Sequence, residues 1–163
     1  MEAIIAFFTQ NFIGKILTTF FVSMVPVIEL RGAIPIGVGM GLPYWLAVVI
    51  SVIGNIVPVP FIILFIKKIF AWMRKVSKKL DGLVTRLENR AEKKRATVEK
   101  YAFWGLFILV AIPLPGTGAW TGALVAAMMD MPLKTAFPSV VLGVVGAAVI
   151  VVVVTALGFT ALS

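Results

Sequence analysis

The chain has 163 residues, of which 61% are hydrophobic and 13% charged, and its formal net charge is +8. Soluble domains are roughly 45–50% apolar and about 25% charged, so this composition indicates an integral membrane protein. The chain contains no cysteine and no histidine, which excludes disulfides, thiolate nucleophiles and Cys/His metal centres. We therefore expect neither a metal nor a cofactor.

Residues 2–42 are predicted to form a helical hairpin that is broken in its middle. The stretch from Val25 to Gly41, VPVIELRGAIPIGVGMG, places Glu29 and Arg31 among prolines and glycines. A charge at membrane depth costs roughly 2.5–3.5 kcal/mol on insertion scales, and non-helical backbone is tolerated there only inside protein or beside water. We interpret the stretch as a re-entrant segment with functional charges. The alternative is a short external loop in which both charges are solvated.

Residues 43–66 are predicted to be a transmembrane helix. Pro43 suits the first turn of a helix, where its missing N–H does no harm. Pro58 and Pro60 predict a kink later in the span. Asn55 is expected to make a hydrogen bond to a neighbouring helix, worth about 1 kcal/mol.

Residues 67–100 hold the whole net charge, because Lys and Arg outnumber Asp and Glu there. Apolar residues recur every three or four positions, which predicts an amphipathic helical connector with its weakest point at Gly82. No base-reading motif accompanies the cations, so nucleic acid is not an expected partner. A basic segment between apolar ones is typical of a cytoplasmic loop. The helix would lie on the membrane surface or fold against the protein as a solvated connector.

Residues 101–131 are predicted to form a second broken hairpin, and residues 132–157 a second transmembrane helix. The break contains PLPGTGAW, from Pro113 to Trp120. The order of prolines and small residues repeats at an offset of 89 residues, as in Pro26 with Pro115 and Pro43 with Pro132. The predicted units are therefore a first repeat at 1–66, the connector at 67–100 and a second repeat at 101–163.

This repeat predicts the topology. If each break is a hairpin that enters and leaves on one side, one transmembrane helix separates the two hairpins, so they enter from opposite faces. The fold class is then an all-α membrane protein of two inverted repeats, each a re-entrant hairpin plus a transmembrane helix. The basic connector places the second hairpin on the cytoplasmic side. The alternative is four full spans with the breaks in external loops.

The pairing of ELRGAIPIG, from Glu29 to Gly37, with PLPGTGAW in a short chain with a basic middle resembles the small multidrug export protein family. That family is distantly similar to the DedA superfamily. The resemblance implies inverted re-entrant hairpins and a location in the bacterial inner membrane. It also implies movement of an anionic lipid such as undecaprenyl phosphate, with Glu29 and Arg31 as the positions carried over.

The first functional hypothesis is a transporter or flippase for an amphipathic or lipid-phosphate substrate. Arg31 offers a planar fork suited to phosphate, and the N–H groups around Gly116, Thr117 and Gly118 would add positive potential. Glu29 would carry a coupling proton. Since Glu29 and Arg31 stand two residues apart, they would not face each other on a helix.

Three alternatives stand beside this hypothesis. In a cationic drug exporter, Glu29 would bind the cation and Phe103, Trp104 and Trp120 would line the path. A scaffold would act through the 67–100 helix. An enzyme is not expected. Hydrolysis needs a nucleophile with a base, or a cluster of carboxylates for a metal, and the chain offers one acid at membrane depth and no Cys or His. Because two full spans would not enclose a pathway, we expect a homo-oligomer surrounded by membrane lipids.

Overall fold

A computed structural model of the chain describes residues 11–99, 102–112, 114 and 116–161, and throughout them the regular structure is helical, as predicted. The parts of the predicted hairpins, connector and second repeat that fall on the other residues lie outside this description. The described helices follow one another in this order: α2 (Phe12–Met24), α3 (Glu29–Gly39), α4 (Tyr44–Ile56), α5 (Pro58–Val76), α6 (Lys78–Glu99), α7 (Phe103–Ala111), α8 (Ala119–Met128) and α9 (Leu133–Ala161).

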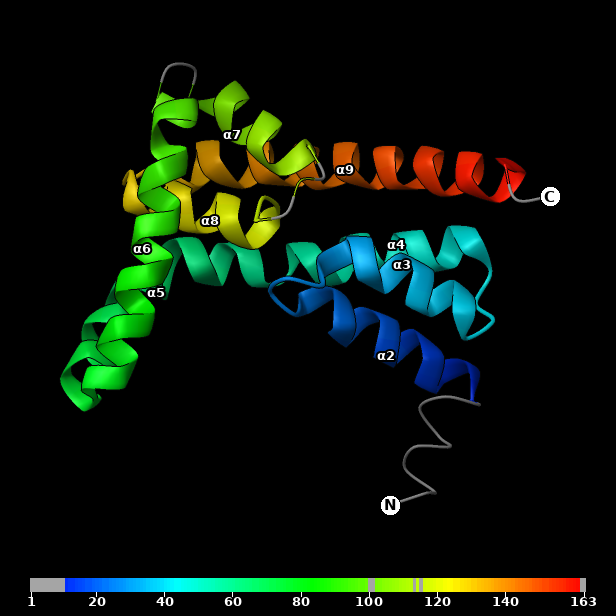
Figure 1. The fold of residues 1–163 in the computed structure, drawn as a ribbon, viewed down its shortest axis with the longest axis horizontal. Helices are drawn as coiled ribbons and strands as arrows, with labels where there is room; N and C mark the ends of the chain where they lie inside the picture. Colours follow the sequence, from blue (N-terminus) through cyan, green and yellow to red (C-terminus); the bar gives the residue numbers. More distant parts are fainter. Residues whose placement is uncertain (1–10, 100–101, 113, 115, 162–163) are drawn as a thin grey trace.

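Within the described part of the chain, two helical stretches are long and apolar enough to cross a membrane, namely Tyr44–Val76 and Leu133–Thr155. At 1.5 Å per residue the shorter one spans about 35 Å, more than the roughly 30 Å hydrocarbon core of a bilayer. The two stretches lie side by side and run in opposite directions (Figure 1). They form the frame on which the remaining helices pack.

The first stretch is interrupted between α4 and α5, at Val57. Pro58 and Pro60 lack the N–H groups that would have bonded to carbonyls one turn earlier. Val57 nevertheless keeps helical backbone angles, with φ −52° and ψ −46°. The predicted interruption is therefore present, and α5 continues onward from α4.

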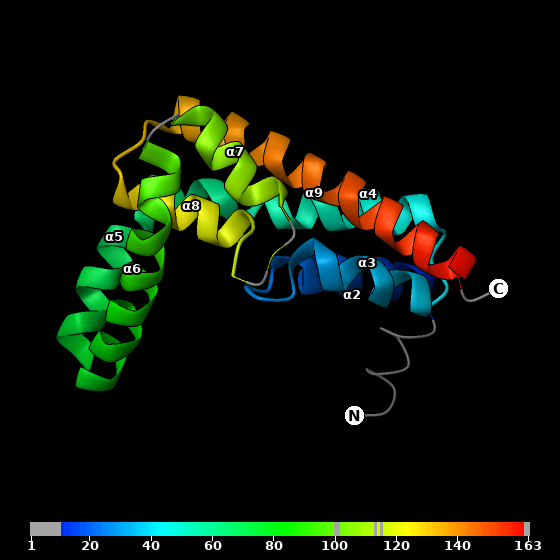
Figure 2. The same ribbon diagram turned by 45° about the horizontal axis from the view of Figure 1, so that its top comes forward.

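The shorter helices form two pairs that open toward opposite ends of the frame. The α2–α3 pair packs on α4, whereas α7 packs on α9 and α8 on α5. The turn at 25–28 meets residues 112, 114 and 116–118 near the middle of the molecule (Figure 1). In Figure 2 this meeting point lies on the side of the molecule away from α9. Two non-helical segments are thereby brought to mid-height of the long helices.

Close glycine packing occurs inside each half of the molecule. A Cβ on Gly37 would touch Thr19 of α2 and Ala47 of α4, and one on Gly122 would overlap Val110 of α7. The Gly-x-x-x-Gly spacings at 37–41 and 118–122 permit such close approach. Gly37 and Gly122 use it within their own halves, and Gly118 is the one of these four glycines that lies against the other half, at Glu29.

The connector is helical, but its break falls at Ser77 and not at Gly82. Ser77 is extended, with φ −158° and ψ 139°, and its hydroxyl accepts from the N–H of Lys79, which caps the start of α6. Gly82 lies inside α6, and nothing lies within 4 Å of the position that a Cβ would take there. A capping serine thus decided the boundary where helix propensity alone had favoured the glycine.

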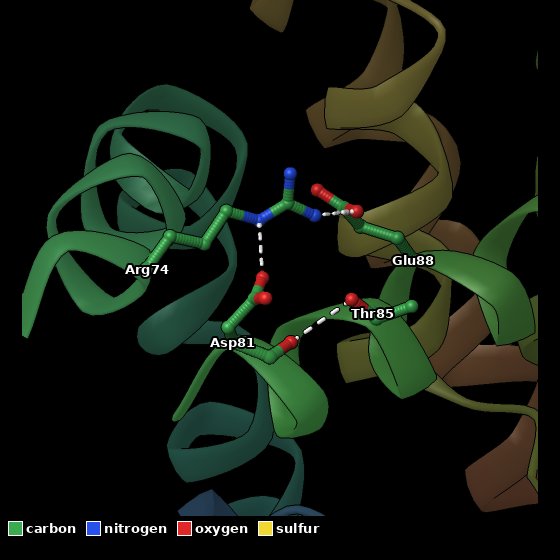
Figure 3. A network of polar contacts seen from close by, with 4 residues as sticks. All are labelled: Arg74, Asp81, Thr85 and Glu88. Atoms are coloured by element: carbon green, nitrogen blue, oxygen red, sulfur yellow. Dashed lines mark hydrogen bonds and ion pairs between the residues drawn. The ribbon is translucent and has the colours of Figure 1, made fainter. Parts of the chain in front are cut away.

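Charged side chains join α5 to α6 (Figure 3). The Nε of Arg74 lies 3.4 Å from Asp81, and its guanidinium also pairs with Glu88, about two turns further along α6. A second ion pair, Lys67 Nζ to Asp130 at 2.6 Å, ties α5 to the loop before α9. All five side chains in these pairs are at least 33% exposed, so the pairs orient the connector more than they stabilise it.

Candidate functional site

The predicted site residues Glu29, Arg31, Thr117 and Gly118 come together where the two helical pairs meet. We call this place the junction and define it as Glu29 and Arg31 of α3 with residues 112, 114 and 116–120. Glu29 begins α3 and is buried, while Arg31, two residues on, is partly exposed. Both side chains reach into the second pair, 81 to 91 residues away in sequence.

The carboxylate of Glu29 lies at the N-terminus of α8. Its Oε1 accepts a hydrogen bond from the N–H of Trp120 at 3.1 Å, and the N–H of Ala119 also faces it. The first N–H groups of a helix have no partner within the helix and carry its partial positive charge. Glu29 therefore satisfies these donors and places a negative charge where the dipole of α8 stabilises it.

Gly118 makes this close approach possible. Its φ of +136° is open essentially to glycine alone, and a Cβ built there would overlap the carboxylate of Glu29. The glycine therefore serves both the turn before α8 and the seat of the carboxylate.

The guanidinium of Arg31 lies at the other end of the break, beyond the C-terminus of α7. Nη1 donates to the carbonyls of Leu114 and Thr117, each at 2.9 Å, and Nη2 donates to that of Ile112 at 3.3 Å. Carbonyls that end a helix carry partial negative charge. Arg31 thus binds two carbonyls within the break and, through Ile112, the residue that caps α7.

Thr117 ties the break together from within. Its Oγ1 lies 2.7 Å from the carbonyl of Ile112 and 2.8 Å from that of Leu114, and it accepts from the N–H of Leu114 at 3.2 Å. Arg31 Nη2 reaches the same oxygen at 3.4 Å. The hydroxyl holds the carbonyls in the arrangement that Arg31 recognises.

Two sequence expectations at the junction have clear outcomes. Glu29 and Arg31 form no ion pair with each other within 4.0 Å, in agreement with their spacing along the helix. Gly116 supplies a turn with φ +78°, but it is exposed and no hydrogen bond joins it to either charge. Its predicted contact with an anion remains a prediction.

Trp120 contributes more than the sequence had indicated. Its indole N–H donates to the carbonyl of Met24 at 2.8 Å, so that one residue contacts both the end of α2 and, through its backbone, Glu29. The same ring lines an apolar groove of about 620 Å³ along α5, which also includes Phe61, Phe65 and Trp72. Trp120 therefore both donates to Glu29 and lines the groove. The sequence had named Trp120 only as one of three aromatic residues lining a path.

The other aromatic residues proposed for a path lie elsewhere. Trp104 is 61% exposed and packs edge-to-face on Phe103 and Phe107, all on α7. Neither Phe103 nor Trp104 lines the groove along α5. Of the three aromatic residues expected to line a cation path, only Trp120 lines this groove.

The expectation that Asn55 bonds to a neighbouring helix is wrong. Its amide is 1% exposed, yet neither Oδ1 nor Nδ2 has a hydrogen-bond partner, and the Oγ of buried Ser51 one turn earlier has none either. The helices packed on this face of α4 present other groups instead.

Comparison with known proteins agrees with these features. Residues 29–150 match the model of the family described as "Putative small multi-drug export protein", and this stretch is more than half of the chain. It includes both apolar helical stretches in large part and the whole junction. No curated protein and no solved structure matches the chain. The chain is thus a membrane protein that belongs to the small multi-drug export protein family.

Proposed function

We propose that this protein is a transporter that moves amphipathic molecules across the membrane, and that the junction opens and closes the path. The observation that carries the proposal is the position of Glu29 and Arg31. Each binds backbone groups of the opposite helical pair at mid-height of the long helices. Charges at such depth are rare and typically mark substrate or ion pathways.

We propose further that the two halves are inverted repeats and that the helical pairs are re-entrant hairpins. The offset of 89 residues relates the first residues of α4 and α9, Tyr44 and Leu133. It also relates three pairs of residues with positive φ: Val27 with Gly116, Glu29 with Gly118, and Gly41 with Asp130. Since positive φ is uncommon outside glycine, three coincidences at one offset support a common backbone plan.

For the orientation, the excess of Lys and Arg in residues 67–100 supports a cytoplasmic connector. The open end of the second hairpin then faces the cytoplasm and that of the first faces outward. The resemblance to DedA-type proteins supports the bacterial inner membrane, which the protein would cross more than once.

The substrate class follows from the groove beside the junction. An apolar body would lie along α5 against Phe61, Phe65 and Trp120, and its polar group would reach the junction. An anionic headgroup, such as a lipid phosphate, would replace the carboxylate of Glu29 at the N-terminus of α8 and pair with Arg31. A cationic drug would instead pair with Glu29 itself. The family description favours neither chemistry, so both are tested below.

Proton coupling is the mechanism we propose for opening the junction. When ionised, Glu29 holds the N-terminus of α8 through a charge-assisted hydrogen bond. Protonation removes that charge, weakens the contact and frees the donors for an anionic headgroup. Because Arg31 has its own carbonyl partners, release of Glu29 would leave one of the two contacts intact.

The test uses purified protein in liposomes under an imposed pH gradient, with ethidium and a fluorescent lipid phosphate as separate probes. Glu29→Gln can still accept from Trp120, so we expect it to fold and to lose the pH dependence of transport. Asp130→Asn, an exposed acid outside the junction, is the matched control and should keep that dependence. Wild-type pH dependence in Glu29→Gln would refute the coupling role.

Arg31→Lys distinguishes binding at the junction from a purely structural role. Lysine keeps the charge but lacks the fork that spans the carbonyls of Leu114 and Thr117. At temperatures below the melting temperature of the variant, we expect the transport rate of the preferred probe to be at least tenfold lower than in the wild type. Because Glu29 and Arg31 have separate backbone partners, the stability losses of Glu29→Gln and Arg31→Gln should add. Mutual rescue of both stability and transport in the double variant would overturn the proposal.

The protein would act as a homo-oligomer. Val27, 94% exposed, and Leu114, 55% exposed, lie on the non-helical segments that meet at the junction. Such backbone does not face lipid at hydrocarbon depth, so a second copy would cover this side and enclose water around the junction.

Introduced cysteines test this arrangement, because the chain has none of its own. We expect Val27→Cys to form a disulfide-linked dimer in native membranes, and Trp45→Cys, exposed on α4, to remain monomeric as the control. Monomeric Val27→Cys would contradict a second copy at this face. Scaffolding through α6 remains the alternative function, and it predicts that no probe is transported at all.

A further inference from the structure

Helix α4 carries two polar side chains that nothing in the described structure satisfies. Ser51 and Asn55 stand four residues apart, so they lie on the same face of the helix. They are 0% and 1% exposed, and Ser51 Oγ, Asn55 Oδ1 and Asn55 Nδ2 all lack hydrogen-bond partners. Native proteins pair the large majority of such buried atoms, and in a membrane the free-energy cost of leaving them unpaired is higher still.

Other buried hydroxyls of the same half show that this is not the rule for the protein. Thr19 donates to the carbonyl of Lys15 at 2.8 Å, and Ser23 to that of Phe20 at 2.7 Å. These side chains satisfy themselves on their own helix, as is common for Ser and Thr. Ser51 and Asn55 instead present free donors and acceptors inside the protein.

The fold does not require polar residues at these positions. On the proposed 89-residue repeat, on which this step rests, Ser51 and Asn55 correspond to Val140 and Val144 of α9. Both valines are fully buried. The second half therefore fills the same helix face with apolar groups, and the polar pair in the first half needs a reason of its own.

We infer that Ser51 and Asn55 form a binding site for a small neutral hydrogen-bonding group, which is an internal water molecule or a hydroxyl or amide of the transported molecule. A cation would satisfy the oxygens and leave the Asn55 N–H groups unpaired, while an anion would leave Oδ1 unpaired. Only a group that both donates and accepts satisfies the pair. In addition, no three acidic side chains gather at a metal site among the residues described.

The site makes the first half the more readily hydrated half of the protein. A water held by these three atoms of α4 would be comparable to the buried waters of soluble domains, which typically make about three hydrogen bonds. A polar group that passes through the protein would then find partners along α4 but not along the equivalent face of α9.

Selective ¹⁵N labelling of asparagine provides the experiment, because the chain contains only Asn11, Asn55 and Asn89. In micelles, the side-chain amide signal of Asn55 is identified by its loss in Asn55→Val. We expect cross-relaxation between its Nδ2 protons and water. The signal should weaken in Ser51→Ala and stay unchanged in Thr19→Val, whose wild-type hydroxyl has its own partner.

Addition of ethidium or a lipid phosphate distinguishes the two sources of the ligand. A water signal that persists indicates bound water, and one that disappears with a shift of the amide indicates a group of the added molecule. Absence of water contact together with an Asn55 amide signal that neither probe shifts would overturn the inference, as would a signal unaffected by Ser51→Ala. This measurement does not depend on transport. It can therefore fail while the role of Glu29 and Arg31 holds, and it can succeed while that role fails.

Discussion

Replacement of Gly118 by alanine tests the seat of the Glu29 carboxylate most directly. The backbone at Gly118 has φ +136° and ψ −170°, a region occupied almost only by glycine, so a side chain there costs about 1–3 kcal/mol. The new Cβ would also displace the Glu29 carboxylate from the N-terminus of α8. A lost hydrogen bond to a charged group costs about 1.5–3 kcal/mol. We therefore expect Gly118→Ala to lower the free energy of unfolding by about 2.5–6 kcal/mol.

Gly116→Ala provides the matched control within the same segment. Its φ of +78° imposes a strain of roughly 1–2 kcal/mol, but nothing lies within 4 Å of a Cβ at that position. Reversible unfolding in mixed detergent and SDS micelles would measure both variants. The difference between them isolates the collision with Glu29 from the backbone strain.

A double-mutant cycle completes the test. With Glu29→Ala in the background the carboxylate is gone, so Gly118→Ala should cost only its backbone term of about 1–3 kcal/mol. Equal losses for Gly116→Ala and Gly118→Ala, or an unchanged cost of Gly118→Ala without Glu29, would show that the carboxylate does not lie against Gly118.

Three further predictions concern the break and the connector. Thr117→Val should lower the free energy of unfolding by about 1–3 kcal/mol because the hydrogen bonds of the hydroxyl within the break and to Arg31 are lost. Thr117→Ser should keep the wild-type stability, and equal effects of the two changes in thermal melts would exclude the hydroxyl. Arg74→Gln should cost less than about 1 kcal/mol, since its partners are solvated, and a larger loss in the same melts would mean that α6 is held mainly by this residue. A thiol introduced by Ser77→Cys should react with a membrane-impermeant maleimide only in inside-out vesicles, and labelling of intact cells would reverse the proposed orientation.

Composition and local pattern were sufficient to predict the class of protein and most of its helices. An apolar excess with few charges is a property of the whole chain, and it required no knowledge of packing to indicate a membrane protein. Helix starts such as Leu133 follow from Pro132, whose missing N–H is harmless only there. Local rules gave way where two of them competed, as at Ser77, where a side-chain cap outweighed the low helix propensity of Gly82.

The sequence also singled out Glu29 and Arg31 as candidate site residues, because ionised groups between prolines in an apolar stretch are costly wherever they lie. It determined that they would not pair with each other. Only the tertiary structure decided what they do contact, since their partners are backbone groups at the ends of α7 and α8. Every residue carries such N–H and C=O groups, so no residue pattern can mark them. The same reason applies to Asn55, whose lack of a partner depends on which groups the helices packed against α4 present.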